Sequence, residues 1–268
     1  MAGYDSSFFH TSYAGKRVLV LAPHQDDELN IAGSSIQNFV KAGAEVFVAF
    51  STNGDGYFSI FNFTAEGRLS EAVNALRVLG VDTEHIIAMG YGDTFNKFPG
   101  GHTFYSEDTP FTSSRGKTHT YGAAGLQDFS YLMRHEHSRY CRSDYLRDLE
   151  ELILYVHADV ILAVDFDRHS DHRMLSLCFE QAMGKILSRP GNDYRPEVFK
   201  RFAYSTAFDA VSDLFADNLL ETKKPENMTC TDPIDTSCYA WKGRVRFPVP
   251  ECGRKPLLEG NPIAEALR

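Results

Sequence analysis

The stretch KRVLVLAPHQDDE at residues 16–28 joins a short apolar run to a cluster of polar side chains. The run from Arg17 to Ala22 fits a strand that is buried on both faces of a parallel sheet. Directly after Pro23 the chain becomes polar, with HQDDE at residues 24–28. Open α/β sheets bind ligands outside the carboxyl ends of their strands, so these side chains mark a candidate site.

A second polar cluster follows a second apolar strand. The strand is predicted at 159–164, and it runs into DFDRHSDH at residues 165–172. Both clusters lie at the carboxyl ends of strands, and in a parallel sheet such ends face the same crevice. The sequence therefore predicts that the two clusters meet.

The two clusters together offer the ligands of a catalytic metal ion. His24 and Asp27 are close enough along the chain to reach one ion, and the third ligand would be His169 or His172. Two histidines, one carboxylate and an open position make the ligand set of a catalytic zinc that keeps one water. Non-haem iron uses a similar set, so ligand type alone leaves iron open. A bound zinc would lower the pKa of its water from about 15.7 to about 7 and polarise a carbonyl.

The remaining polar residues suggest roles around such an ion. Asp26 is adjacent to a ligand without being needed as one, which makes it the candidate general base. The histidine of the second cluster that is not a ligand could, as a cation, stabilise an oxyanion or protonate a leaving amine. Asp171 would fix the tautomer of an imidazole. A single histidine or aspartate in a loop is usually only a solvated surface group, but two clusters at the ends of buried strands favour a site.

The segments Pro23–Glu28 and His169–His172 resemble the PIG-L or LmbE-like family of zinc-dependent N-acetylglucosaminyl deacetylases, whose hallmarks are A-H-P-D-D-E and a later H-x-D-H. The resemblance spans roughly residues 16–210. Gln25 and Ser170 stand where the family usually has Pro, and Pro23 stands one place early. These departures remove neither a ligand nor the base.

The family resemblance assigns a role to each residue of the two motifs. It implies that zinc is bound by His24, Asp27 and His172. It also implies that Asp26 is the base and that His169 assists the transition state.

Two further residues enter as substrate binders through the same resemblance. The family commonly carries R-x-x-E on a helix, which here falls on Arg68 and Glu71, and the arginine contacts substrate. Asp93 follows a predicted strand at the position where such deacetylases often hold a sugar hydroxyl. The alternative for both is an ordinary solvated charge.

The spacing of apolar residues predicts a strand–helix–strand pattern repeated along the chain. This pattern predicts an α/β fold, a three-layer, Rossmann-like doubly wound and mostly parallel sheet of the LmbE-like type. No G-x-G-x-x-G follows the first strand, so a dinucleotide site is excluded. We expect one catalytic domain over 1–268, with a long loop insertion at 94–143 that forms a wall over the site, and an irregular tail from about 217. The predicted strands are 17–22, 46–50, 85–90, 159–164 and a candidate at 198–204, and the predicted helices cover about 29–42, 69–79, 145–156 and 172–187.

Composition limits the partners and the location. The net charge of −9 without a long basic run argues against nucleic acid. No apolar run approaches the ~18 residues that a membrane span needs, and the opening residues lack the features of a signal peptide. This predicts a cytoplasmic protein, while a removed leader would leave export open. The odd number of cysteines, five, favours free thiols.

The predicted function is that of a zinc-dependent hydrolase that removes the acetyl group from an N-acetylated amino sugar, with Zn2+ as cofactor and a small molecule or oligosaccharide as substrate. The hydrolysis follows from the residues, and the sugar follows from the family resemblance. Two alternatives stay open: a zinc amidase for a different amide, and a catalytically inactive carbohydrate-binding protein on the same scaffold. The complete set of ligands and base argues against the second alternative, because a binding protein has no need of Asp26.

Overall fold

The computed structural model describes residues 13–56, 63–94, 108–164 and 169–201, together with Ala203 and Ala266. Its centre is a sheet of five strands in the order β3-β2-β1-β4-β5, and every neighbouring pair is parallel. The chain moves outward from β1 through β2 to β3, and then crosses back to β4 on the other side of β1. The strands are β1 Arg17–Ala22, β2 Glu45–Thr52, β3 Ile86–Tyr91, β4 Val160–Val164 and β5 Glu197–Arg201.

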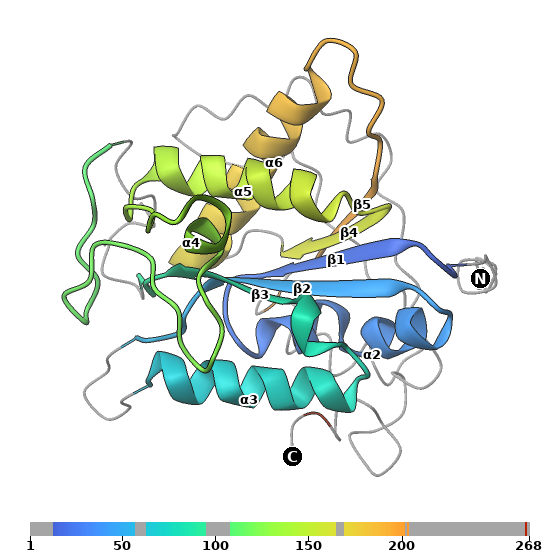
Figure 1. The fold of residues 1–268 in the computed structure, drawn as a ribbon, viewed down its shortest axis with the longest axis horizontal. Coiled ribbons are helices and arrows are strands. Elements are labelled where there is room, and N and C mark those ends of the chain that lie inside the picture. Colours follow the sequence, from blue (N-terminus) through green and yellow to red (C-terminus); the bar gives the residue numbers. More distant parts are fainter. Residues whose placement is uncertain are drawn as a thin grey trace.

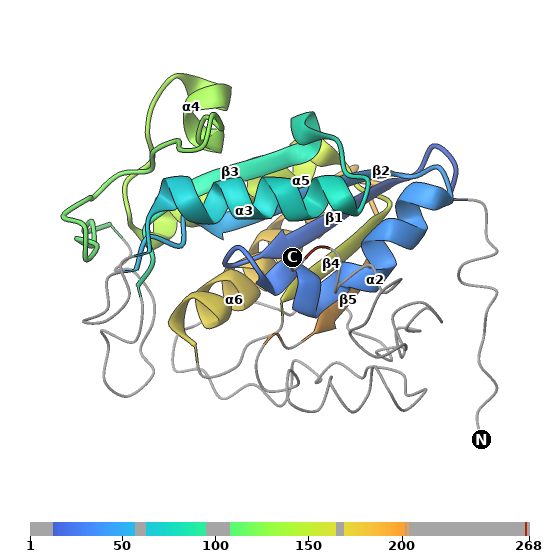
Figure 2. The same ribbon diagram turned by 90° about the horizontal axis from the view of Figure 1, so that it is seen from below.

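Helices cover both faces of this sheet (Figure 1). Helices α2 and α3 lie on one face, and α4, α5 and α6 lie on the other, which confirms the predicted three-layer, doubly wound α/β fold. Figure 2 shows α2 and α3 crossing the sheet from the side that they cover. The helices are α2 Asp27–Lys41, α3 Ala65–Val78, α4 Phe129–Arg134, α5 Arg142–Val156 and α6 Ser170–Leu187, with a short 3-10 helix η1 at Thr83–His85.

The central strand β1 explains why the first motif can be read from the sequence. Residues 18–22 are completely buried, and Val20 lies between Val48 of β2 and Leu162 of β4. A strand that is covered on both faces needs apolar residues at every position rather than at alternate ones. Full burial of each Val or Leu side chain contributes about 1.5–3 kcal/mol. The polar residues after Ala22 therefore begin at the point where the strand leaves the core.

The segment 94–143 is more structured than the predicted loop. It contains α4, whose N-cap Asp128 accepts a hydrogen bond from the backbone N–H of Tyr131, and α5 already begins at Arg142. Helix α4 has only six residues. That is too short for apolar residues to recur at helical spacing, so periodicity does not reveal it. The part of this segment at 95–107 lies outside the described residues, as do residues 165–168 and the tail from 217 to 265.

Two further predictions concern thiols and membrane spans. Cys141 and Cys178 are buried free thiols, as the odd cysteine count indicates, and the other three cysteines lie outside the described residues. Among the helices of the described residues, none has the length and the apolar character needed to cross a membrane.

Candidate metal centre

The two sequence motifs meet at the carboxyl edge of the sheet. Strand β1 leads through the turn at 23–26 into α2, and β4 precedes α6, for which His169 is the N-cap. Because β1 and β4 are parallel neighbours, both motifs leave the sheet at the same edge. The predicted meeting of the two polar clusters is present in the structure.

One carboxylate oxygen of Asp27 joins two histidines. Asp27 Oδ2 lies 3.0 Å from His24 Nδ1 and 3.2 Å from His172 Nε2, and all three side chains are at most 5% exposed. Tetrahedral zinc with nitrogen and oxygen ligands at about 2.0–2.2 Å would place those ligand atoms about 3.3 Å apart. Asp27 Oδ1 is buried and has no hydrogen-bond partner among the described residues. A buried carboxylate oxygen without a donor is rare and costly, so this donor set fits a cation.

The second ring nitrogen of His24 faces a different carboxylate. His24 Nε2 lies 3.1 Å from Asp171 Oδ2, and Asp171 is completely buried. If Nδ1 binds a metal, Nε2 carries the ring proton and donates it to Asp171, which fixes the tautomer and orientation of the ring. Asp171 therefore lies where its expected role requires.

The buried charges of this cluster stabilise one another. Burial alone would raise the pKa of Asp27, but His172 and His24 outweigh it and hold that pKa well below its usual range. Burial likewise opposes a charge on His24, but hydrogen bonds with Asp171 and Asp27 raise the pKa of His24 well above its ordinary value. The cluster thus needs positive charge to balance its carboxylates. A metal ion that displaces protons can supply that charge.

Both histidines of the second motif lie near His24. One ring nitrogen from each of His24, His169 and His172 falls within a group whose atoms are all within 4.8 Å of one another. The two candidates differ in their surroundings, because His172 is within 3.2 Å of the Asp27 carboxylate whereas His169 caps α6. The backbone N–H of Asp171 donates to His169 Nδ1 at 3.2 Å, which leaves Nε2 of His169 to carry the ring proton.

The charge state of His169 differs from the expected cation. Burial, followed by the positive charge on His24, lowers the pKa of His169 to about 4. The ring is therefore neutral near pH 7, with its proton on Nε2. Sequence alone gives no measure of this burial, because one of the rings that surround His169 is that of His24, which is distant along the chain.

Asp26 stands beside the cluster in a strained conformation. Its φ is 143°, in a region that non-glycine residues rarely adopt and that costs about 1–3 kcal/mol. Burial and the adjacent charge of Asp27 raise its pKa, and Arg68 opposes this shift with Nη2 3.3 Å from Asp26 Oδ1. A raised pKa suits a group that must accept a proton and later release it.

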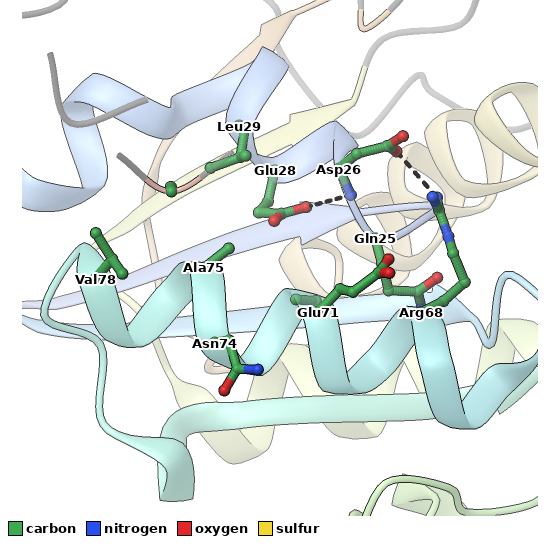
Figure 3. A pocket seen from close by; sticks show the side chains of 11 residues that line it. Gln25, Asp26, Glu28, Leu29, Arg68, Glu71, Asn74, Ala75 and Val78 are labelled. Atoms are coloured by element: carbon green, nitrogen blue, oxygen red, sulfur yellow. Dashed lines mark hydrogen bonds and ion pairs between the residues drawn. The ribbon is translucent and has the colours of Figure 1, made fainter. Parts of the chain in front are cut away.

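A pocket of about 460 Å3 adjoins Asp26 between α2 and α3 (Figure 3). Arg68 and Glu71 reach it from the first two turns of α3, and Glu28 reaches it from α2. Glu28 is a member of the site that our sequence analysis did not single out. Burial raises its pKa to about 8, and its Oε2 accepts the backbone N–H of Asp26 at 2.8 Å. An acidic residue in the first turn of a helix is ordinary, so only its burial distinguishes it.

Asp93 lies closer to the histidines than to this pocket. Its side chain is largely buried, and Oδ2 is 4.0 Å from His24 Nε2. Its backbone N–H donates to Asp55 Oδ1 at 3.0 Å, and the Tyr121 hydroxyl donates to Asp55 Oδ2 at 2.7 Å. Tyr121 thus ties the segment after residue 108 to the edge of the sheet. Asp55 follows β2, and our sequence analysis did not single it out.

An open parallel α/β sheet with a buried group of histidines and aspartates at its carboxyl edge defines a candidate metal-dependent enzyme. Residues 19–183, more than half of the chain, match the PIG-L family, described as GlcNAc-PI de-N-acetylase. The chain belongs to this family, as the two motifs indicate. No curated protein sequence matches it.

Several solved structures are similar to the chain at low sequence identity. N,N'-diacetylchitobiose deacetylase from Pyrococcus horikoshii is 18% identical, with a TM-score of 0.45 over 76% of this chain and 70% of that one. A deacetylase of the teicoplanin biosynthesis pathway is 17% identical, with a TM-score of 0.42 over 63% of each chain. The A40926 pseudoaglycone deacetylase is 13% identical, with a TM-score of 0.42 over 78% of this chain and 70% of that one.

Proposed function

We propose that this protein is a zinc-dependent hydrolase that removes the acetyl group from an N-acetylated amino sugar. The observation that carries this proposal is the buried carboxylate of Asp27, which lies within 3.2 Å of ring nitrogens from both motifs, with Asp26 beside it. Membership of a family described as a de-N-acetylase supports the reaction type. The expected products are acetate and the free amine.

In this proposal His24, Asp27 and His172 hold the metal. Their donor atoms are nitrogen and carboxylate oxygen, which zinc accepts. A bound Zn2+ would supply a water of lowered pKa and polarise the acetyl carbonyl. Asp171 keeps the proton of His24 on Nε2, so that Nδ1 stays free to bind the ion.

Asp26 handles the protons of the reaction. Its carboxylate accepts a proton from the attacking water, and its raised pKa lets it hold that proton. When the bond between the carbonyl carbon and the nitrogen breaks, Asp26 returns the proton to the leaving amine. Arg68 keeps the carboxylate in place through its contact with Asp26 Oδ1.

His169 stabilises the negative charge that develops on the carbonyl oxygen. Its ring proton is on Nε2, because Nδ1 accepts the backbone N–H of Asp171. A neutral imidazole can donate this hydrogen bond without first being protonated. His169 therefore serves as an oxyanion donor and not as the acid.

The pocket between α2 and α3 is the proposed site for the sugar. Arg68, Glu71 and Asn74 line it with hydrogen-bonding groups, and Ala75 and Val78 add apolar surface. Convergent polar groups on a partly apolar wall are typical of small-molecule sites. The role of Asp93 as a sugar binder, which the family resemblance implies, remains part of the proposal, for a hydroxyl that approaches the histidines.

Substitution Asp26→Asn tests the reaction. We expect the variant to bind zinc as the parent does and to lose turnover by about 10²–10⁴-fold, because it cannot accept a proton. Metal analysis and acetate release from a panel of N-acetylated mono- and oligosaccharides measure the two quantities. The matched control is Asp82→Asn at an exposed residue in the turn before η1. Unchanged turnover in Asp26→Asn would refute the assignment.

A further inference from the structure

Thr94 follows β3 and lies beside Asp171, the partner of His24 in the candidate metal centre. It is completely buried, although it is polar. Its hydroxyl is 2.5 Å from Asp171 Oδ1, and its backbone N–H is 3.1 Å from Asp171 Oδ2. Both oxygens of the Asp171 carboxylate are therefore bound by this one residue.

The same carboxylate is the partner of His24. Asp171 Oδ2 accepts both the Thr94 N–H and the His24 Nε2–H, the latter at 3.1 Å. A carboxylate can rotate about its own side-chain torsions unless several donors fix it. Thr94 supplies those donors from the segment that follows β3, whereas Asp171 belongs to α6 and His24 follows β1. The contact thus joins three separate elements at one side chain.

The direction of the hydrogen bonds follows from the number of protons. Thr94 Oγ1 is also 2.7 Å from the hydroxyl of Ser170, and a threonine hydroxyl has a single proton to donate. The short contact to Asp171 is that of a charge-assisted bond, so the Thr94 proton points to the carboxylate. The Ser170 hydroxyl oxygen lies on the other side of the Thr94 hydroxyl, as a second acceptor at 2.7 Å. Ser170 stands where the family usually has Pro, which has no hydroxyl, so this extension belongs to the present chain.

We propose that Thr94 is a positioning residue of the metal site, which orients Asp171 and through it the His24 ring, and that Ser170 acts through Thr94. Thr94 is not one of the proposed metal ligands. Its effect reaches the site through a chain of hydrogen bonds from Ser170 to Thr94 to Asp171 to His24. The inference rests on the proposed function only in taking His24 as a metal ligand.

Zinc affinity tests the role of Thr94 without reference to turnover. The metal-free parent and variants compete with a chromogenic chelator for Zn2+. We expect Thr94→Val to bind about tenfold more weakly, the lower end of the effect that follows loss of a partner of a metal ligand. Thr94→Ser keeps the hydroxyl and should bind like the parent. If valine prevents folding, the pair Thr94→Ala and Thr94→Ser differs in the same hydroxyl and replaces it.

A matched control separates positioning from general destabilisation. Thr120 is also buried, and its hydroxyl donates to buried Asp128 at 2.8 Å, away from the metal centre. Thr120→Val should lower the thermal unfolding midpoint and leave zinc affinity unchanged. Equal losses of zinc affinity in Thr94→Val and Thr120→Val would overturn the inference.

Substitution of Ser170 tests the order of the residues in this series of hydrogen bonds. In the parent protein, Ser170→Ala should weaken zinc binding by less than Thr94→Val does. When Ser170→Ala is added to the Thr94→Val variant, zinc affinity should not fall further, because the effect of Ser170 passes through the threonine hydroxyl. Additive losses would show that Ser170 acts independently. A parent that binds no zinc would overturn the proposed function together with this inference. A parent that binds zinc as tightly as Thr94→Val does would overturn the inference alone.

Discussion

His24 connects the two motifs because its two ring nitrogens face different carboxylates. Nδ1 lies beside Asp27 from its own motif, and Nε2 lies beside Asp171 from the other. The sequence indicates both motifs, but it leaves His169 and His172 as alternatives for the third ligand. Only the family resemblance and the contact between His172 and Asp27 separate them. The pKa shifts of Asp26 and His169 could not be predicted, because burial in the folded chain is the largest cause of both.

Substitution of each histidine of the second motif separates ligand from oxyanion donor. His172→Ala removes one of three protein ligands, so zinc content after dialysis should fall sharply. His169→Ala should retain zinc and lose about 10²–10³-fold in turnover, as expected for an oxyanion donor. Metal analysis with acetate release distinguishes the two. Loss of zinc in His169→Ala with retention in His172→Ala would reverse the assignment.

At the scale of helices and strands, the predicted elements are those with a clear apolar pattern. β1 matches its predicted bounds, and α2 ends at Lys41, close to the predicted end at 42, with Gly43 at φ 82° after it. β2 extends beyond the predicted 46–50 to Thr52, where Thr52 Oγ1 donates to the carbonyl of Pro23 at 2.8 Å. Such contacts between the ends of strands are tertiary and leave no periodic signal. The short helix α4 escaped prediction because six residues are too few to show a helical period.

The N-terminus of α3 carries Arg68, and Thr64 stabilises it. The Thr64 hydroxyl accepts the backbone N–H of Gly67 at 3.1 Å, which satisfies one of the free donors of the first turn. Thr64→Ala should lower the free energy of unfolding by about 0.5–2 kcal/mol. Chemical denaturation measures this loss, with Thr83→Ala in the exposed start of η1 as control. Equal stability of Thr64→Ala and the parent would show that the cap contributes nothing.

Across the whole molecule, the alternation of strands and helices was sufficient to predict the doubly wound sheet. The contents of the core between the sheet and α5 were not predictable to the same degree. Three tyrosines lie there in contact with one another: Tyr91 has ring centroids 5.7 Å from Tyr140 and 4.7 Å from Tyr145. All three are completely buried, although each carries a hydroxyl. Tyrosine occurs both in cores and on surfaces, so its burial here follows from packing alone.

The tyrosine cluster predicts how stability depends on alkaline pH. Burial raises the pKa of Tyr91, Tyr140 and Tyr145, so the folded protein keeps three protons that the unfolded chain releases above pH ~10. Below pH ~10 the three tyrosines are protonated in both states and do not change the stability. Above pH ~10 each of them lowers the free energy of unfolding by about 1.4 kcal/mol per pH unit.

Because total stabilities are about 5–15 kcal/mol, three such groups should unfold the protein within about one to four pH units above 10. Circular dichroism reports unfolding, and tyrosinate absorbance reports ionisation of the tyrosines. As the pH rises, we expect the part of the absorbance that comes from these three residues to change in the same transition as the circular dichroism. Tyr145→Phe removes one of the three linked protons and should move the transition to higher pH. Tyrosinate absorbance from the cluster at pH ~10 in a protein that is still folded would contradict the prediction, because it would require the buried hydroxyls to ionise in place.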